Sequence, residues 1–267
     1  MSGAVFTEAI NKSVLDELRV NMNDIELIEN DGVPMESDWH RRCMNLLIDQ
    51  IEHYFRERQD FYVGGNMFIY FSLEQARNKD FRGPDFFFVK DTNRFPERRF
   101  WVVWEENGRT PNVVIELSSP TTEDEDHTSK FKIYRDQLRV RDYFIYEPYT
   151  QKLEGWRLDG SRYRPLPLDT SGRLFSEELG LSLGIWERDA DGLLIPWLRF
   201  FDQDGIVLPF PAEAERMKAE IEKQRAEAEK QRAETEKQRA NDAVAEIARL
   251  RALLSKQSSS TNGVNPH

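Results

Sequence analysis

The sequence has few of the residues that build several common kinds of site. It contains one cysteine, Cys43, which excludes a disulfide framework and a cysteine-rich zinc site. A lone thiol also fits a reducing compartment, so we expect a cytoplasmic protein. Of the four histidines, His40 and His53 lie thirteen residues apart on one predicted helix. That spacing is too wide for a shared ion and argues against a histidine metal centre.

Long apolar runs are also missing. The most apolar stretch, residues 192–198, is short and interrupted by Pro196, so no segment predicts a transmembrane helix. The first 20 residues include acids and no sustained apolar run, which argues against a signal peptide. Gly64–Gly65 lacks the spacing and the lysine of a phosphate-binding loop. Ser118–Ser119–Pro120 is not the nucleophile elbow of a serine hydrolase.

Basic residues are outnumbered, with 37 lysines and arginines against 48 aspartates and glutamates, and the net charge is −11. Residues 212–256 contain 11 basic and 10 acidic side chains, so the rest of the chain has a net charge of −12. Such an acidic body repels nucleic acid at long range and argues against the bulk electrostatic binding that histones use. A local basic groove stays compatible with this charge.

A seven-residue repeat marks the C-terminal part of the chain, where Lys-Gln-Arg-Ala recurs at residues 223, 230 and 237. These strong helix formers predict one long helix over 211–256, followed by a disordered tail over 257–267. Its apolar stripe consists of alanines until Ile247 and Leu254, so a weak coiled coil and a charge-laced single helix both remain open. Self-association is expected only near the Ile247–Leu254 end.

The body between these ends predicts one core over residues 26–210, preceded by an extension over 1–25. Apolar periodicity predicts helices over 37–58 and 128–138 and strands over 61–71, 85–90, 112–118 and 141–147, with a hairpin over 152–163. The continuous apolar run of 112–118 indicates a central strand. The expected fold is α+β, a mixed sheet flanked by helices, with a β-rich extension and a long C-terminal helix.

Two acidic residues interrupt the apolar strands. Asp85 opens the run Phe86–Val89, and Glu116 lies within Val113–Leu117. A carboxylate in such a strand is costly unless a cation accompanies it, and two neighbouring carboxylates suit Mg²⁺ or Mn²⁺. Lys130, on the following helix, could act on an attacking water. Alternatively, Asp85 is a turn residue and Glu116 faces solvent from an edge strand.

Several basic residues lie near the predicted cleft in sequence: Arg94, Arg98, Arg99, Lys130, Lys132, Arg135, Arg139 and Arg141. Some could contact a phosphodiester backbone. The alternative is that they pair with the acidic surface of the body.

Four segments together resemble a known family. They are Pro84–Asp85, the strand and loop 114–122 around Glu116, residues 126–130 with Tyr134, and residues 142–148. This ordered set is similar to the Uma-two family, bacterial restriction-endonuclease-like proteins of the PD-(D/E)XK nuclease superfamily. The resemblance covers about residues 26–154, and many members also have a β-rich extension and a charged helical tail.

The resemblance implies a restriction-endonuclease-like core in which Asp85 and Glu116 bind the metal. The superfamily lysine normally stands two residues after that glutamate, where this chain has Ser118, and Lys130 would replace it. An acid of the first core helix often assists, and Glu36 is the nearest candidate. Asp126 lies one helical turn before Lys130 and could orient it, or it could cap the helix.

These observations predict a Mg²⁺- or Mn²⁺-dependent endonuclease that hydrolyses phosphodiester bonds of DNA. Asp85, Glu116 and Lys130 are the expected catalytic residues, with support from Glu36, Ser118 and Asp126. We expect a cytoplasmic homo-oligomer, such as a dimer, to which the C-terminal helix contributes, and no membrane partner. The alternative is an inactive nuclease-fold protein that serves as an interaction or oligomerisation module, which the displaced lysine and the acidic body favour.

Overall fold

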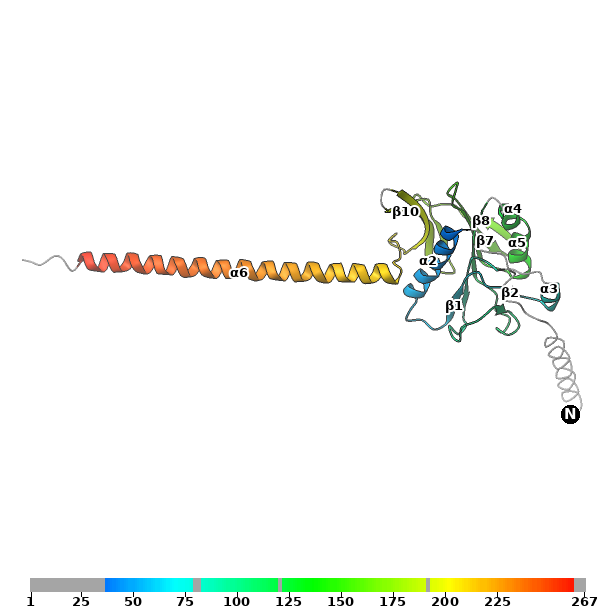
Figure 1. The fold of residues 1–267 in the computed structure, drawn as a ribbon, viewed down its shortest axis with the longest axis horizontal. Coiled ribbons are helices and arrows are strands. Elements are labelled where there is room, and N and C mark those ends of the chain that lie inside the picture. The colour runs from blue at the N-terminus through cyan, green and yellow to red at the C-terminus, as the bar shows by residue number, and fades with distance from the viewer. Residues whose placement is uncertain (1–36, 79–82, 120–121, 191–192, 262–267) are drawn as a thin grey trace, which may run out of the picture. The chain divides into compact units, whose positions relative to one another are not determined.

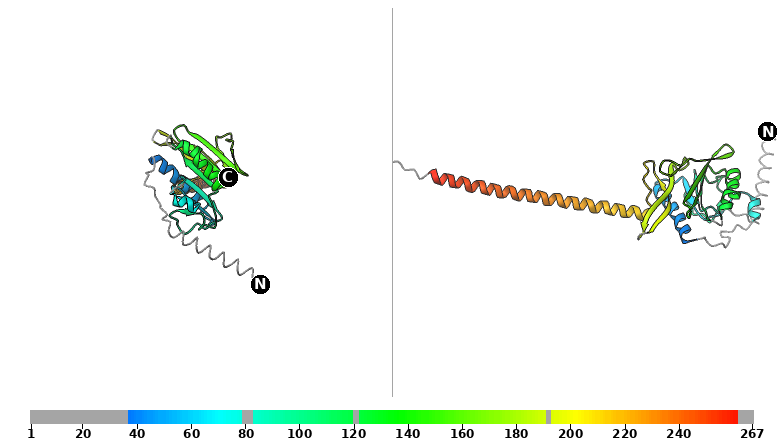
Figure 2. Two further views of the ribbon diagram at one scale, coloured as in Figure 1. Left: turned by 90° about the vertical axis from the view of Figure 1, so that its right-hand side faces the viewer. Right: turned by 90° about the horizontal axis from the view of Figure 1, so that it is seen from above.

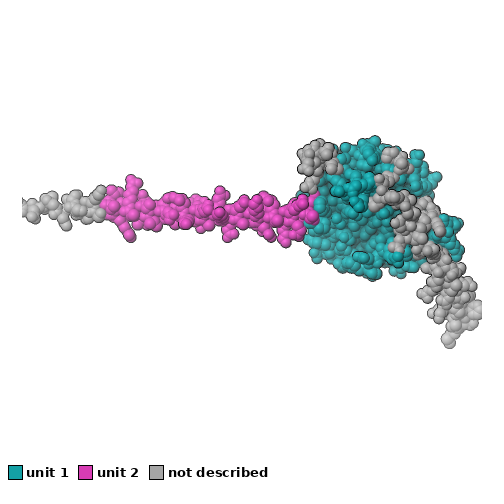
Figure 3. Space-filling model, viewed as in Figure 1, with its two compact units in different colours: residues 1–211 teal, residues 212–267 magenta. Residues whose placement is uncertain are grey.

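The computed structural model describes residues 37–78, 83–119, 122–190 and 193–261 (Figure 1). The chain divides into two compact units, Met1–Pro211 and Ala212–His267, which have different colours in Figure 3. The expected extension over residues 1–25 lies outside the described residues. None of the described helices has the length and apolar character needed to cross a membrane.

A six-stranded mixed sheet forms the centre of the first unit, in the order β1-β3-β5-β6-β7-β8. Strand β5 is antiparallel to β3 and parallel to β6. All five residues of β5 are buried, so its apolar run reflects coverage on both faces, and its predicted central place is confirmed. The strands are β1 (Phe61–Gly64), β3 (Phe86–Lys90), β5 (Val113–Leu117), β6 (Asp142–Glu147), β7 (Lys152–Asp159) and β8 (Arg162–Pro165).

Helices cover the two faces of this sheet. On one face, α2 (Asp38–Tyr54) buries Cys43, Leu47 and Ile51 against β1, β3 and β5. The opposite face is covered by α4 (Glu123–His127), α5 (Ser129–Lys132) and the π-helical turn η1 (Ile133–Gln137). Figure 1 and the further views of Figure 2 show α2 and α4–α5 on opposite sides of the strands.

The β-rich extension forms a second, three-stranded sheet of β9 (Leu174–Ser176), β10 (Leu181–Ala190) and β11 (Leu193–Phe201). Its buried residues Leu183, Leu198 and Phe200 join the same core as α2. A smaller cluster lies at β2 (Ile69–Tyr70), α3 (Leu73–Arg77) and β4 (Trp101–Val102). The first unit is therefore an α+β body in which the expected extension packs on the α2 side.

A buried ionic network ties the extension to the central sheet. Asp142, at the start of β6, is fully buried, and its Oδ1 accepts a hydrogen bond of 2.9 Å from Nε of Arg157. Its Oδ2 accepts a 2.7 Å hydrogen bond from the hydroxyl of Ser176 in β9. A carboxylate in this position is stable only while these partners are in place.

Three elements differ from the sequence-based expectation. The strand expected over 61–71 is interrupted after β1, where Asn66 has a φ of 47°. The helix expected over 128–138 is α5 continued by η1, where Ile133 stays helical (φ −64°, ψ −46°) and the Leu138 N–H donates to the Ile133 carbonyl in a π-helical hydrogen bond. Helix α6 spans Pro211–Thr261, about 77 Å at 1.5 Å per residue. Residues 257–261, expected to be disordered, are thus helical, and 262–267 lie outside the described residues.

Candidate metal and catalytic site

Two acidic residues stand at opposite positions at one end of the central strand pair. The antiparallel register pairs Phe86 with Ile115, so Asp85, one residue before β3, stands opposite Glu116 in β5. The sequence places both acids next to apolar strand residues, and pairing of β3 with β5 then brings them together. The side chain of Asp85 is 14% exposed, whereas Glu116 is almost completely buried.

Glu116 is held from two elements of the helical layer. Its Oε1 accepts a 2.6 Å hydrogen bond from the hydroxyl of Tyr134 in η1. Its Oε2 lies 3.2 Å from Nζ of Lys130 in α5. The sequence placed Tyr134 on the inner face of its helix, and the structure shows that its hydroxyl reaches the strand carboxylate.

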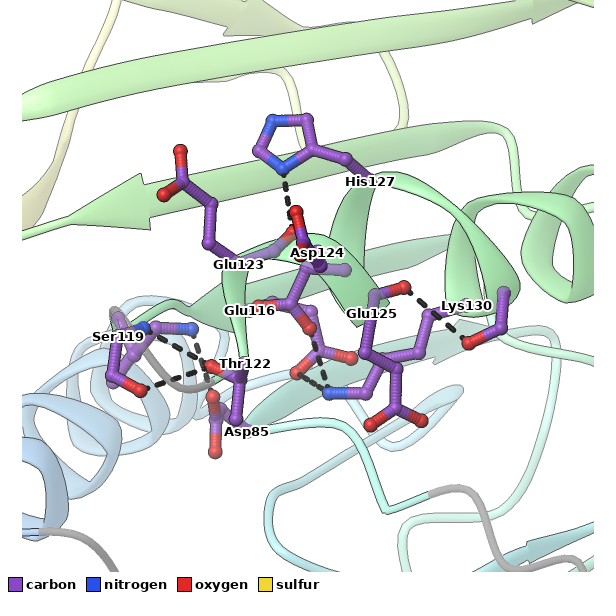
Figure 4. A network of polar contacts seen from close by, with 12 residues as sticks. Asp85, Glu116, Ser119, Thr122, Glu123, Asp124, Glu125, His127 and Lys130 are labelled. Atoms are coloured by element: carbon purple, nitrogen blue, oxygen red, sulfur yellow. Dashed lines mark hydrogen bonds and ion pairs between the residues drawn. The ribbon is translucent and has the colours of Figure 1, made fainter.

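Lys130 bridges Glu116 and a second buried acid. Its Nζ lies 2.8 Å from Oδ1 of Asp126, one helical turn earlier, so these two residues make the i,i+4 contact that the sequence suggested. Asp126 is 1% exposed, and α4 is fixed to the sheet by a 2.9 Å hydrogen bond from the Tyr143 hydroxyl to the Asp126 carbonyl. Figure 4 shows the Lys130 nitrogen directed at these carboxylates.

The acids of this site have different cationic partners. Glu116 and Asp126 contact the Lys130 ammonium, whereas Asp85 contacts His40. Burial, opposed by Lys130 but reinforced by Asp126 and Asp85, raises the pKa of Glu116 to about 8. Burial disfavours charge on Lys130, but Glu116 and Asp126 outweigh it and raise the pKa of the ammonium. Lys130 is therefore protonated at neutral pH, and Glu116, with a pKa of about 8, mostly carries a proton there when no cation is bound.

Asp85 has partners that the sequence patterns did not reveal. Its Oδ1 lies 2.6 Å from Nε2 of His40 in α2, and its Oδ2 accepts a 2.8 Å hydrogen bond from the backbone N–H of Leu117. The sequence alone shows only that His40 is too far from His53 to share a metal. Its contact with a residue 45 positions away depends on how α2 packs, and no local pattern carries that information.

Two other residues were expected to support the site, and the structure describes one of them, Ser118. Ser118 is 2% exposed, and its hydroxyl has no hydrogen-bond partner among the residues that the structure describes. It follows Glu116 by two residues, at the place of the usual lysine. Glu36 lies outside the described residues. An unpaired buried hydroxyl two residues after Glu116 is a polar position that a metal-bound water could satisfy.

The donor set of the site is small. Across the described parts of the chain, no three His, Cys, Asp or Glu side chains are grouped so that they could hold a metal ion. The site therefore offers two carboxylates rather than a complete protein cage. Mg²⁺ keeps several waters and commonly uses one or two carboxylates, so Asp85 and Glu116 fit it, with the Ser118 hydroxyl available to a bound water.

The basic residues expected near the cleft are mostly engaged elsewhere. Arg98 pairs with Glu106, and Arg94 lies 3.5 Å from Glu52. Both arginines stack on aromatic rings beside β1, at the end where Phe61 pairs with Lys90 and away from Asp85. Of the basic residues expected near the cleft, Lys130 is the one whose described contacts include an acid of the site.

The chain matches a family model and a solved structure. A family model named Uma2, with the description "Putative restriction endonuclease", matches residues 16–194, a range that contains all the acids of the site and Lys130. A solved structure of "a putative nuclease belonging to DUF820" from Anabaena variabilis ATCC 29413 is 11% identical. It has a TM-score of 0.40, and the match covers 57% of this chain and 81% of that chain. No curated protein matches the chain.

Proposed function

The chain belongs to the Uma2 family of restriction-endonuclease-like proteins, and from this premise we propose that it is a divalent-metal-dependent endonuclease that hydrolyses phosphodiester bonds of DNA. The observation that carries the proposal is the site itself. Asp85, one residue before β3, stands opposite Glu116 of the adjacent strand β5, and the protonated Lys130 lies 3.2 Å from Glu116. Burial and the neighbouring acids raise the pKa of Glu116, and a cation bound there would favour its charged form.

In this proposal Asp85 and Glu116 hold Mg²⁺ or Mn²⁺. The bound ion would polarise a phosphoryl oxygen and lower the pKa of a coordinated water. Lys130 carries a proton at neutral pH, so it would orient the attacking water or a phosphate oxygen by donating a hydrogen bond, and would not act as a base. Asp126 fixes the Lys130 side chain, and Tyr134 fixes the Glu116 carboxylate.

A cleavage assay tests these roles. Supercoiled plasmid is incubated with the full chain and Mg²⁺ or Mn²⁺, with EDTA as the metal-free control. Asp85→Asn and Glu116→Gln keep the size of each side chain and should reduce cleavage to the EDTA level, while Lys130→Met should lower it by about 100-fold or more. Asp159→Asn removes an exposed carboxylate and serves as the matched control. Cleavage unchanged in both acid variants would refute the assignment.

A second candidate is an inactive nuclease-fold protein that acts as an interaction or oligomerisation module. The observation that favours it is Ser118, which stands where the superfamily normally has its lysine. Thermal melting with and without Mg²⁺ separates the two candidates. A midpoint raised by Mg²⁺ in the wild type but not in Asp85→Asn supports the metal site, whereas no Mg²⁺ effect in either chain supports the module.

The same proposal extends to the domain bounds, the partner, the location and the oligomeric state of the protein. The nuclease domain would comprise residues 26–210, with DNA as partner and the cytoplasm as location, in keeping with a single free thiol. We expect a homo-oligomer, such as a dimer, in which the helix over 211–256 contributes through Ile247 and Leu254, which are 51% and 66% exposed. Light scattering of the full chain and of the double variant Ile247→Lys/Leu254→Lys measures this contribution, and equal masses would refute it.

A further inference from the structure

Asp85 lies outside the regular strand that follows it, so strand pairing alone does not fix its side chain. Residue 85 precedes β3, and the pairs between β3 and β5 begin at Phe86. Its carboxylate is instead contacted by α2 through His40 and by the end of β5 through the Leu117 N–H. The position of the Asp85 carboxylate therefore depends on how α2 and the end of β5 are placed next to residue 85.

The contact with His40 is close and sheltered. Nε2 of His40 lies 2.6 Å from Oδ1 of Asp85, and the two side chains are only 12% and 14% exposed. His40 is in the first turn of α2, which Ser37 caps by accepting a hydrogen bond from the His40 backbone N–H. The imidazole is thus carried on a helix whose start is fixed and whose inner face is buried in the core.

A glycine sets the spacing between α2 and the Asp85 backbone. A Cβ atom at residue 65 would lie 2.2 Å from the Asp85 carbonyl oxygen and 3.0 Å from both Ile48 and Met44 of α2. The first distance is impossible for real atoms, and the obstacle is backbone that cannot rotate away. The next residue, Asn66, donates a 2.9 Å hydrogen bond from its N–H to the Pro84 carbonyl, which fixes the same approach.

We propose that His40 and Gly65 are positioning residues that place the Asp85 carboxylate for the metal. This inference rests on the proposed function, because it assumes that Asp85 is a metal ligand. His40 holds Oδ1 by donating a hydrogen bond from Nε2, while Leu117 holds Oδ2. Gly65 allows α2 and the Asp85 backbone to approach closely enough for that hydrogen bond to form. Each oxygen of the carboxylate keeps a further lone pair that a metal can use.

The test measures metal affinity in the full chain by calorimetric titration with Mn²⁺, without DNA. Two variants of His40 are compared. His40→Leu removes the donor and should weaken Mn²⁺ binding by about 10- to 100-fold, the range typical when an outer partner of a ligand is removed. His40→Gln places an amide N–H on a side chain of similar reach and should retain affinity within a few-fold of the wild type.

Two neighbouring glycines give the second comparison. Gly65→Ala pushes against the Asp85 backbone and should also weaken Mn²⁺ binding by about 10-fold or more. Gly64→Ala meets only side-chain atoms of Phe87 and Tyr62, at 3.0 to 3.1 Å, and should bind Mn²⁺ as the wild type does. Melting temperatures of both variants show how far each substitution disturbs the fold, so affinity lost through general destabilisation is recognised by its presence in both.

The outcomes separate the two proposals. A wild type that does not bind Mn²⁺ refutes the metal site and this inference with it. A wild type that binds, with His40→Leu unchanged, overturns the role of His40 and leaves the metal site standing. His40→Gln as weak as His40→Leu overturns the hydrogen-bond role. If Gly65→Ala does not fold, the His40 pair decides; if it folds and binds normally, the role of Gly65 is wrong.

Discussion

Replacing Lys130 with methionine is expected to make the metal-free protein unstable and the metal-bound protein nearly normal in stability. The substitution keeps an unbranched side chain of similar length and removes its charge. Within the described residues, Lys130 supplies the cation for both Glu116, at 3.2 Å, and Asp126, at 2.8 Å. Both acids are about 1% exposed, so water cannot replace the ammonium without rearrangement of α4 and α5.

The magnitude follows from the burial of the two acids. Deleting one partner of a buried ion pair costs about 3–5 kcal/mol, because it leaves charge without compensation. A domain of this size loses about 2–4 °C of melting temperature per kcal/mol, so the metal-free variant should melt about 6–20 °C below the wild type. A bound divalent cation restores the missing positive charge, so Mg²⁺ should raise the midpoint of the variant more than that of the wild type.

The loss should also depend on pH. Burial, together with Asp126 and Asp85, already raises the pKa of Glu116 to about 8, and loss of Lys130 raises this pKa further. A carboxyl whose pKa is raised by folding binds its proton more tightly in the folded state. Folding therefore gains stability as pH falls through that pKa toward the unfolded value. Without metal, the deficit of Lys130→Met should shrink as pH falls toward about 8 and stay constant below that pH, because Glu116 then carries a proton in both folded proteins.

Differential scanning fluorimetry of the full chain measures all three effects. Lys152→Met is the matched control, because Lys152 is 53% exposed and pairs with Glu154 at the surface, where such a pair contributes about 1 kcal/mol or less. The reasoning fails if Lys130→Met melts within about 2 °C of the wild type without metal. It also fails if Mg²⁺ raises both midpoints equally.

Three further outcomes are expected. Asp142→Ala leaves Arg157 without its buried partner and should cost about 3–5 kcal/mol in urea unfolding, and a loss below about 1 kcal/mol would contradict this. Burial raises the pKa of the Cys43 thiol to about 12, so a thiol reagent should modify it only as fast as the chain unfolds, and rapid labelling of the folded protein would be inconsistent with it. Burial lowers the pKa of His127, but its hydrogen bonds to the Glu123 carbonyl and to Glu154 outweigh this and raise it overall. This stabilisation is present below pH about 6.5 and is lost as pH rises through the folded pKa, so the melting deficit of His127→Gln should be larger at low pH than at high pH.

Much of the central sheet follows from local sequence patterns. The apolar run around Glu116 predicts a central strand, and the Pro-Asp pair before Phe86 predicts the start of its neighbour. The register of β3 and β5 then sets Asp85 opposite Glu116. The convergence of Asp85, Glu116 and Lys130 needs only these local elements and one short connection, so it could be anticipated from composition and spacing together with the family resemblance.

The residues that the patterns did not reveal act through packing between distant segments. His40 reaches Asp85 because α2 lies against β1, β3 and β5 at one particular angle. Gly65 matters because of a backbone 20 positions later. The helix expected over 128–138 changes to π-helical hydrogen bonding at η1, although its residues are compatible with a continuous α-helix. Such features depend on tertiary contacts, which periodicity does not encode.

The packing of α2 has a genetic consequence. Because this helix buries Leu47 and Ile51 in the core and also carries His40 to the site, a substitution deep in that core can disable the site without touching an acid. A cavity left by Leu47→Ala would let the helix shift when warmed, while the sheet keeps its strands. Temperature-sensitive alleles of this gene should therefore gather on the inner face of α2, and second-site suppressors should be larger residues that refill the same space.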